Sequence, residues 1–145
     1  MHRRLWIAVA IVTPATLIVA LAAAAADKKP SGDRSVERGR YLVEHVAMCG
    51  QCHTPRDEQG NPDMRRWLGG APIPLKSPFA SQVWASQAPT IAGLPGGWSE
   101  HDVDHFLQTG RSPIGDTARA PMPQFRMTAD DAAAVAAYLK SLPIR

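Results

Sequence analysis

Three segments of the chain carry apolar residues at the spacing of an amphipathic helix. The first segment starts at Ser35, a residue type that caps helix N-termini, and runs to about Met48. Its apolar and small residues fall on one helical face, at Gly39, Leu42, Val43, Val46 and Ala47. We therefore expect a helix over residues 35–48.

The second segment has helix signals at both ends. Ser99 and Asp102 have the spacing of a capping box, and Trp98 and Val103 occupy the positions of a hydrophobic staple. Gly110 is typical of the residue that follows a helix C-terminus. The pattern predicts a helix between Ser99 and Gly110. Its inward-facing residues are Phe106 and Leu107.

The third segment lies close to the C-terminus. Thr128 and Asp131 have the spacing of a capping box, and Pro143 is a residue that cannot continue a helix. The pattern between them predicts a third helix. Its apolar stripe consists of Val135, Tyr138, Leu139 and Leu142.

Residues 54–98, between the first two predicted helices, contain seven prolines and six glycines. Connections of this length without secondary structure are uncommon in compact domains, although short helices or a hairpin fit within the stretch. Aromatic residues make up only 6% of the 145-residue chain, so side chains offer little material for a core. These observations indicate one small, mostly helical domain whose centre is filled by a bound group.

Residues 1–26 have the pattern of an export signal. Arg3 and Arg4 precede an apolar stretch over residues 5–26, and small residues come directly before Asp27. This is the order of a secretory signal peptide. The apolar stretch is also long enough to span a bilayer, so an uncleaved membrane anchor is the alternative. Either form places the domain of residues 35–145 outside the cytoplasm, behind a flexible leader over residues 27–34.

The charge balance gives no indication of a nucleic-acid partner. The chain has 16 basic and 13 acidic residues, a net charge of +3. Without Arg3 and Arg4, 14 basic residues remain against the same 13 acidic ones. A balance this even, without a long basic run, lacks the basic patch of nucleic-acid-binding proteins.

The sequence Cys49-Gly50-Gln51-Cys52-His53 uses both cysteines of the chain. A C-x-x-C-H sequence is typical of covalent haem attachment, in which the thiols bond to the two vinyl groups and the histidine ligates the iron. We therefore predict Cys49 and Cys52 as the attachment sites of one haem c. His53 is the predicted axial ligand.

Three other uses of the two cysteines fit the sequence less well. A thioredoxin-type site needs a preceding strand, whereas a helix is predicted before Cys49. A disulfide between residues three apart is sterically poor. A zinc site needs two histidine ligands, and their spacing is not that of a zinc finger. The histidines concerned are His45, His53, His101 and His105.

A haem accounts for the long stretch of residues 54–98. Loops can wrap a flat apolar macrocycle, which then replaces part of the missing core. We expect the apolar residues of the stretch to be buried against it. They are Ile73, Leu75, Phe79, Val83, Trp84, Ile91 and Leu94.

Iron bound by His53 has a second axial position, and a methionine thioether suits an electron carrier there because it raises the reduction potential. Met122 stands between two prolines, which hold it in a rigid, extended loop. We predict Met122 as the ligand. Met127, at a staple position before the third helix, is the alternative. The other methionines are remote, or lie close to the His53 side: Met1, Met48 and Met64.

Several further residues have two interpretations. The carboxylates of a buried haem need hydrogen-bond donors or cations as partners. A tryptophan can either donate to such a carboxylate or simply pack, and an arginine can either pair with it or lie at the solvated surface. The sequence does not choose among Trp67, Trp84, Trp98, Arg65, Arg66 and Arg111. His101 and His105 stand four apart on one helix face, but the interleaved Asp102 and Asp104 favour a solvated surface over a metal site. His45 is also expected at the surface.

The C-x-x-C-H sequence, the helix before it, the Met122 loop and the C-terminal helix resemble a class I c-type cytochrome over residues 36–143. Four short sequences are similar, more narrowly, to the monohaem modules in cytochrome subunits of membrane-bound alcohol and aldehyde dehydrogenases. They are Arg38-Gly39-Arg40-Tyr41-Leu42-Val43, Cys52-His53-Thr54-Pro55-Arg56-Asp57, Gly97-Trp98-Ser99-Glu100 and Thr109-Gly110-Arg111. Those subunits carry three such modules, whereas this chain has one C-x-x-C-H sequence.

The resemblance implies an all-α class I cytochrome c fold, with three main helices and long loops wrapped around one covalently bound haem. It implies that the first helix packs on the last near Gly39 and Tyr138. It also implies His53 and Met122 as axial ligands and thioether bonds at Cys49 and Cys52.

Together, these residues and this resemblance indicate an exported, periplasmic electron carrier rather than an enzyme. It would carry single electrons between a donor such as a dehydrogenase and a respiratory-chain acceptor, an oxidase or another cytochrome. No catalytic residues are expected, because both axial positions are filled. The alternative is a haem peroxidase or a gas or redox sensor with an open or displaceable sixth position. The near-neutral charge favours docking through a small apolar patch.

Overall fold

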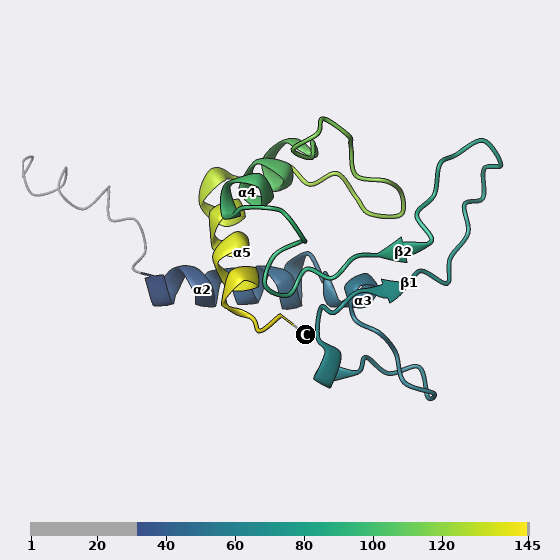
Figure 1. Cartoon of the computed structure of the whole chain (residues 1–145), viewed down its shortest axis with the longest axis horizontal. Helices are drawn as coiled ribbons and strands as arrows, with labels where there is room; N and C mark the ends of the chain where they lie inside the picture. Colours follow the sequence, from purple (N-terminus) through teal and green to yellow (C-terminus); the bar gives the residue numbers. More distant parts are fainter. Residues whose placement is uncertain (1–31, 145) are drawn as a thin grey trace, which may run out of the picture.

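The computed structural model describes residues 32–144. The expected signal or anchor over residues 1–26, and most of the leader over residues 27–34, lie outside the described residues. Three helices frame the domain: α2 (Gly32–Tyr41), α4 (Glu100–Thr109) and α5 (Ala129–Ser141). Figure 1 shows α5 packed across α2 and beside α4. This arrangement confirms a mostly helical domain with long loops.

The first helix starts earlier than the sequence predicts. Helix α2 already includes Gly32, so Ser35 lies inside the helix rather than at its cap. Residues 32–34, which the sequence assigned to the leader, are helical. Asp33 in the first turn favours the earlier start, because an acidic side chain interacts favourably with the positive end of the helix dipole.

Beyond Tyr41 the chain continues as a π-helix, η1 (Leu42–Val46), and then as the short helix α3 (Gly50–His53). The wider turn of a π-helix changes the angular position of the residues that follow it. Val46 is consequently 54% exposed, although the helical pattern places it on the buried face. Leu42 and Val43 are buried as predicted.

The caps of the other two helices agree with the sequence pattern. Ser99 and Asp102 form the reciprocal hydrogen bonds of a capping box at the start of α4, and Gly110 ends this helix in the left-handed conformation, with a φ of 73°. At the start of α5, Thr128 accepts a hydrogen bond from the Asp131 amide, but the Asp131 carboxylate accepts from Arg38 Nε, so only half of the predicted capping box is present. These caps satisfy amide groups that have no partner within the helix.

The core lies where the three helices meet. Helix α5 buries Val135, Tyr138 and Leu139, while α4 contributes Val103 and Leu107. The predicted apolar stripe of the third helix is therefore confirmed for these three residues, and Leu142 packs at its edge.

Helices α2 and α5 touch at Gly39. A Cβ atom at this position would overlap the Ala134 carbonyl and lie 2.7 Å from the Tyr138 Cβ. Only glycine leaves room for the two backbones at this distance. The implied packing of the first helix on the last near Gly39 and Tyr138 is confirmed.

We expect Gly39→Ala to lower the free energy of unfolding by about 1–3 kcal/mol, because the added methyl group forces the two helices apart. Gly32→Ala is the matched control within α2, since a Cβ atom there meets nothing within 4 Å. That control should change stability by no more than about 0.5 kcal/mol. Denaturant unfolding of both variants tests the prediction, and equal midpoints would contradict the close helix contact.

The connection between α3 and α4 contains the short 3₁₀ helix η2 (Met64–Arg66) and a two-stranded antiparallel sheet. Strands β1 (Ala71–Pro72) and β2 (Gln87–Ala88) pair with Ala71 opposite Ala88. The loop between them, residues 73–86, extends away from the helices (Figure 1). Among the described residues, no helix is long and apolar enough to span a membrane.

Candidate functional site

Helix α3 places the C-x-x-C-H residues on one wall of a cavity. Met48, directly before Cys49, has a positive φ of 50°, so the chain turns sharply between η1 and α3. The Cys49 amide donates to the Val43 carbonyl at 3.0 Å, and the His53 amide donates to the Cys49 carbonyl at 2.9 Å. These bonds hold Cys49, Cys52 and His53 close together, and all three line the cavity.

The residues that follow η2 pack against α3 and the residue after it. The Trp67 ring lies so close to Gly50 that a Cβ atom at this position would overlap it. Thr54 is only 2% exposed, and its Oγ1 accepts a hydrogen bond of 3.0 Å from the Leu68 amide. The first variable position of the C-x-x-C-H sequence is thereby restricted to glycine, and α3 is fixed against the core.

His53 is buried, and its ring is oriented by the backbone. The Nδ1 atom donates to the Pro89 carbonyl at 2.8 Å, because a carbonyl can only accept. Burial lowers the pKa of His53, and the bond to Pro89 opposes this effect only in part. The imidazole is therefore neutral at pH 7, and its free electron pair lies on Nε2. Neutral imidazole with an anchored Nδ1 is the form that ligates metals.

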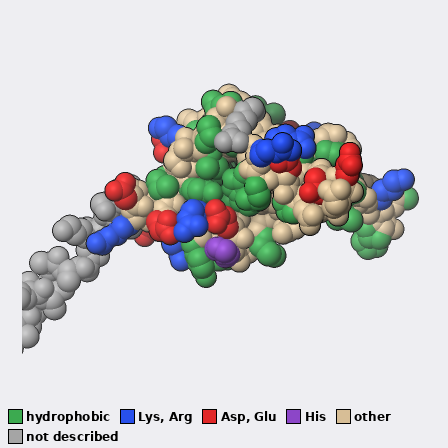
Figure 2. Space-filling model, turned by 90° about the horizontal axis from the view of Figure 1, so that it is seen from below, with side chains coloured by type: hydrophobic (Ala, Val, Ile, Leu, Met, Phe, Trp, Pro, Cys, Tyr) green, Lys and Arg blue, Asp and Glu red, His purple; other side chains and the backbone are tan. Residues whose placement is uncertain are grey.

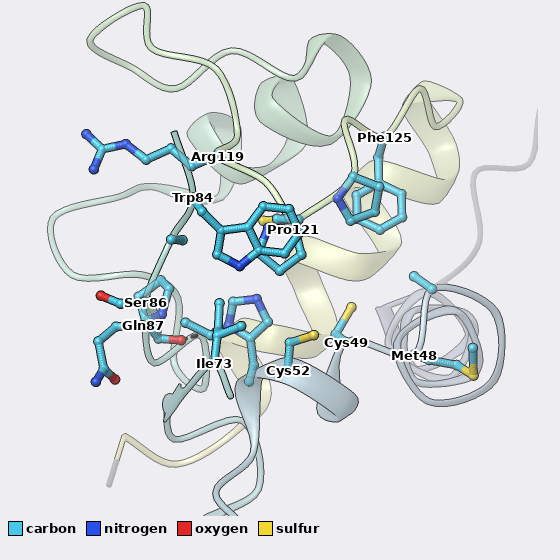
Figure 3. Close-up of a pocket in the computed structure, with 17 residues that line it drawn as sticks. Met48, Cys49, Cys52, Ile73, Trp84, Ser86, Gln87, Arg119, Pro121 and Phe125 are labelled. Atoms are coloured by element: carbon cyan, nitrogen blue, oxygen red, sulfur yellow. Dashed lines mark hydrogen bonds between the residues drawn. The ribbon is translucent and has the colours of Figure 1, made fainter. Parts of the chain in front are cut away.

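The cavity has a volume of about 420 Å³, within the roughly 300–1,000 Å³ that is usual for cofactor sites. Figure 3 shows Cys49 and Cys52 on one side, with Pro121 and Trp84 across the cavity from them. The remaining apolar wall includes Ile73 and Phe125. Residues 121–123 thus form a wall facing α3.

Met122 belongs to this facing wall. It is partly buried and lines the cavity between Pro121 and Pro123. Met127 instead packs against the hydrophobic core, with its amide donating to the Leu107 carbonyl. The structure therefore separates the two methionines that the sequence left as ligand candidates. The ligand role of Met122 stays a prediction.

Two other methionines are poorly placed for such a role. Met64 is 63% exposed and does not line the cavity. Met48 lines the cavity from the Cys49 side and is 54% exposed. Figure 3 shows Met48 well apart from Pro121 and Trp84.

The surroundings of the cysteines do not fit the other uses of a C-x-x-C sequence. Both thiols are free. Burial raises the pKa of Cys49 to about 11, whereas thiol exchange needs a lowered thiol pKa. Helical residues, rather than a strand, precede the motif.

A zinc site is not formed either. Within residues 32–144, no group of three or more His, Cys, Asp or Glu side chains is arranged to hold a metal ion. His45, His101 and His105 are exposed and do not line the cavity. The stacked rings of His101 and His105, 6.4 Å apart, lie on a solvated face of α4 as the sequence predicts.

The prediction that the long loop buries its apolar residues is only partly correct. Ile73 and Trp84 line the cavity, whereas Ile91 and Leu94 pack against the hydrophobic core. The prediction is wrong for three residues, Leu75, Phe79 and Val83, which are 59%, 67% and 71% exposed.

The β1–β2 pairing explains this exposure. The pairing directs residues 73–86 away from the helices, and hydrogen bonds within the loop hold this shape. The Trp84 Nε1 atom donates to the Leu75 carbonyl at 2.9 Å, and Ser77 Oγ donates to the Phe79 carbonyl at 3.0 Å. We call residues 73–86 the hairpin loop.

The structure also decides among most residues that the sequence offered as carboxylate partners. Trp67 donates to the Tyr138 hydroxyl and Trp98 packs on Phe106, so neither lies at the cavity. Arg65 and Arg66 form ion pairs with Asp63. None of these four candidates lines the cavity.

The other two carboxylate-partner candidates from the sequence are Arg111 and Trp84, and one further residue at the cavity was not named from the sequence. Arg111 donates to the Gly115 carbonyl and lies outside the cavity. Trp84 lines the cavity, with its ring nitrogen already donating to Leu75. Arg119, which sequence reasoning did not single out, is the arginine that lines the cavity. Its position three residues before Met122 was the available signal.

The side chains around the cavity fit a covalently bound haem. Two thiols three residues apart and an anchored imidazole lie on one wall, and a thioether belongs to the opposite wall. Apolar side chains line much of the space between them. This set matches the attachment and ligation chemistry of haem c.

The chain belongs to the Cytochrome c family, whose pattern matches residues 36–143. The three helices, the long loops and the cavity next to α3 are those of a class I cytochrome c fold. Membership in this family implies covalently bound haem c, for which Cys49 and Cys52 supply the C-x-x-C-H sequence.

Several characterised proteins are similar to this chain. A "Diheme cytochrome c-type" protein of Cereibacter sphaeroides is 38% identical over 112 residues, covering 74% of this chain and 35% of that protein. The fructose dehydrogenase cytochrome subunit of Gluconobacter japonicus is 35% identical, covering 74% and 22%. The cytochrome c subunit of the quinone alcohol dehydrogenase of Gluconacetobacter polyoxogenes is 37% identical, covering 79% and 26%. The chain thus spans between about a fifth and a third of the length of these relatives.

Proposed function

We propose that this chain is a monohaem c-type cytochrome that carries single electrons between a dehydrogenase and a respiratory-chain acceptor. The observation that carries the proposal is one cavity lined by Cys49, Cys52, His53 and Met122. Haem iron held by histidine and methionine supplies one-electron chemistry. No catalytic residue is needed for this function.

The proposal gives each of the four residues a role that its position supports. Cys49 and Cys52 hold the macrocycle by thioether bonds, so it stays bound without a large protein core. His53 offers Nε2 as the axial ligand, because Nδ1 is engaged by Pro89. Met122 offers its sulfur from the loop of residues 121–123.

The export signal and domain limits of the sequence are part of this proposal. Residues 1–26 serve as a signal peptide or membrane anchor, and a short leader connects them to the cytochrome c domain. The domain then works in the periplasm, either soluble or tethered to the inner membrane by residues 5–26.

A dehydrogenase as electron donor is supported by the relatives, several of which are cytochrome subunits of dehydrogenases. The acceptor is proposed to be an oxidase or another cytochrome.

The hairpin loop is the proposed docking surface for the dehydrogenase. Ile73 and Trp84 at its base line the cavity, while Leu75, Phe79 and Val83 are exposed beyond it. The loop contains one charged residue, Lys76. In Figure 2, the right-hand end of the molecule shows hydrophobic side chains beside a basic one. The proposed partner is an apolar surface of the dehydrogenase around its electron-donating cofactor, because such a surface complements the exposed apolar side chains of the hairpin loop.

We expect Phe79→Ser to slow electron transfer from a purified dehydrogenase of the related type about tenfold without changing the reduction potential. Lost apolar contact weakens the short-lived complex, since such complexes bury little area. The rate should vary little with added salt, because the loop has little charge to screen. Ile114→Ser is the control, since Ile114 lies outside the loop and is also exposed, at 85% against 67% for Phe79. Equal effects of both variants, or a hundredfold salt dependence, would contradict the docking surface.

A specific observation favours the second candidate function, a peroxidase or a gas or redox sensor. Met122 also lines a second, more open hollow of about 450 Å³, next to Asp116 and Gln124. A small ligand in this hollow has access to the methionine loop. In this second function, such a ligand displaces the Met122 thioether and takes the sixth coordination position of the iron.

One titration separates the two functions. We expect the purified, haem-loaded protein to give one reversible one-electron transition in a spectroelectrochemical titration. Added peroxide, cyanide or carbon monoxide should leave its absorption spectrum unchanged. Rapid binding of any of these ligands, or peroxide turnover, would favour the second candidate and overturn the carrier proposal.

A further inference from the structure

We propose that Trp67, Tyr138 and Glu44 form a network that positions helix α3 and so keeps the sixth coordination position of the iron closed. None of the three side chains lines the cavity, so each acts through other residues. The inference rests on the proposed function, because it concerns the haem ligands that the cavity is proposed to bring together.

Helix α3 is too short to hold its own orientation. It contains four residues, Gly50–His53, and a single helical turn gains too few hydrogen bonds to be stable by itself. Met48 has a positive φ and marks a sharp turn, so the preceding π-helix does not simply continue into α3. The direction in which α3 presents His53 therefore depends on contacts with other segments.

The Trp67 ring provides such a contact at the start of α3. Its atoms Cη2 and Cζ3 occupy the space in which a Cβ atom of Gly50 would lie, so the ring fits only against glycine. The ring is itself oriented by a hydrogen bond, in which Nε1 donates to the Tyr138 hydroxyl at 3.2 Å. Rotation of the ring breaks this bond and also changes the surface against which Gly50 packs.

Tyr138 connects the ring to the π-helix η1. The residue is only 6% exposed, and its hydroxyl donates to Oε1 of Glu44 at 3.0 Å while it accepts from Trp67. Burial raises the pKa of Tyr138; the bond from Trp67 opposes this effect, and the bond to Glu44 adds to it. The hydroxyl therefore keeps the proton that it donates.

Glu44 is held at the other end of the network. Its second carboxylate oxygen accepts a hydrogen bond of 3.3 Å from Arg40, which also pairs with Glu37. His45 Nε2 lies 3.8 Å from the same Glu44 oxygen. On the π-helix, Glu44 reaches α5 while the next residue, His45, is exposed. The carboxylate is thus fixed on the side of η1 that faces Tyr138.

These contacts close a ring around the C-x-x-C-H sequence. On one side of the ring, the backbone leads from Glu44 through the turn at Met48 into α3. On the other side, contacts lead from Gly50 to Trp67, then to Tyr138 and back to η1. Hydrogen bonds in such a network polarise and strengthen one another. The network therefore holds η1 and α3 in a fixed relative position across the turn.

The proposed iron ligands make this fixed position functional. His53 on α3 and Met122 on the facing wall both line the cavity, so their separation must match two iron–ligand bonds. Residues behind metal ligands commonly control the orientation of those ligands. If α3 moves, the neutral thioether is the ligand that is more easily displaced. The network then decides between a closed electron carrier and a protein with a displaceable sixth ligand.

The test is Tyr138→Phe in the haem-loaded protein, which keeps the aromatic ring in the core and removes the hydroxyl. Amide hydrogen exchange of residues 49–54 should become about tenfold faster, as expected for a lost hydrogen bond, while the amides of α4 keep their rates. Added imidazole should bind the oxidised iron about tenfold more tightly, because the thioether competes less well. A merely structural role of Tyr138 predicts faster exchange throughout the domain and unchanged imidazole binding.

Matched variants make the test specific. Tyr41→Phe removes the other tyrosine hydroxyl of the chain, which is outside the network, and should change neither measurement. Trp67→Phe should reproduce the effect of Tyr138→Phe, whereas Trp98→Phe, at the edge of the core and outside the cavity, should not. Glu44→Gln keeps an oxygen that accepts from the Tyr138 hydroxyl and should behave like the parent protein. Glu44→Leu removes this acceptor and should behave like Tyr138→Phe.

The double variant Trp67→Phe/Tyr138→Phe should be affected no more than either single variant, because the two residues act through one shared bond. Fully additive effects would overturn the proposal. It is also overturned if Tyr138→Phe matches the parent protein, or if Tyr41→Phe causes the same change. If Tyr138→Phe does not fold, Glu44→Leu is compared with Glu44→Gln, and equal imidazole affinities overturn the proposal. A parent protein without haem would refute the proposed function instead, and hydrogen exchange would still test the network.

Discussion

We expect Met122→Ala to lower the reduction potential by on the order of 100 mV, since axial ligands set haem potentials over a range of roughly 0.8 V. Loss of the thioether also leaves one coordination position for an added ligand. The measurements are a spectroelectrochemical titration and the absorption spectrum in the presence of cyanide or imidazole. The weak far-red band that indicates methionine-sulfur ligation should disappear.

Met127→Ala is the matched control for this prediction. Met127 packs against the hydrophobic core outside the cavity. Truncation of a fully buried methionine costs roughly 2–5 kcal/mol of stability. Because Met127 is only partly buried, Met127→Ala should lower the free energy of unfolding by about 2 kcal/mol or less. The far-red band should remain. A Met127→Ala variant that loses the band while Met122→Ala keeps it would refute the ligand assignment.

The second large effect is expected when both cysteines are changed. In a host with cytochrome c maturation machinery, the Cys49→Ala/Cys52→Ala variant should carry no haem that survives a denaturing gel. The variant should also unfold at much lower denaturant concentration, because the cavity then lacks the group that fills it. Haem staining and denaturant unfolding provide the two measurements.

Gln51→Ala controls for the effect of changing this motif. Gln51 is exposed and does not line the cavity. This variant should stain for haem as strongly as the parent protein. Haem staining of the double cysteine variant, at parent strength, would show that the thiols are not the attachment sites.

The helices could be predicted because their signals are local. Ser99, Asp102 and Gly110 determine the limits of α4 through their own hydrogen bonds and backbone conformation. Thr128 does the same for α5. The start of α2 could not be predicted in this way, because Ser35 is an acceptable helix residue as well as a cap.

The site was predictable where one short sequence carries it. The C-x-x-C-H residues are adjacent in the chain, so they reach the same wall by local helix geometry. The Pro89 carbonyl that orients His53 and the Trp67 ring behind Gly50 come from distant residues without a sequence signal. Such partners depend on how the loops fold.

The hairpin loop shows the limit of reasoning from hydrophobicity. Leu75, Phe79 and Val83 are apolar, so burial is the natural expectation from sequence. The antiparallel pairing of β1 and β2 places them beyond the cavity instead. Arg119 was missed because a lone arginine in a loop gives little sequence signal for a site; its side chain is exposed although it lines the cavity.

Intact mass spectrometry of the haem-loaded protein tests the central claim most directly. The account predicts the mass of the polypeptide plus one haem, retained after denaturation, with the added mass on the peptide that contains Cys49 and Cys52. A protein made with active cytochrome c maturation that shows the mass of the polypeptide alone would contradict it.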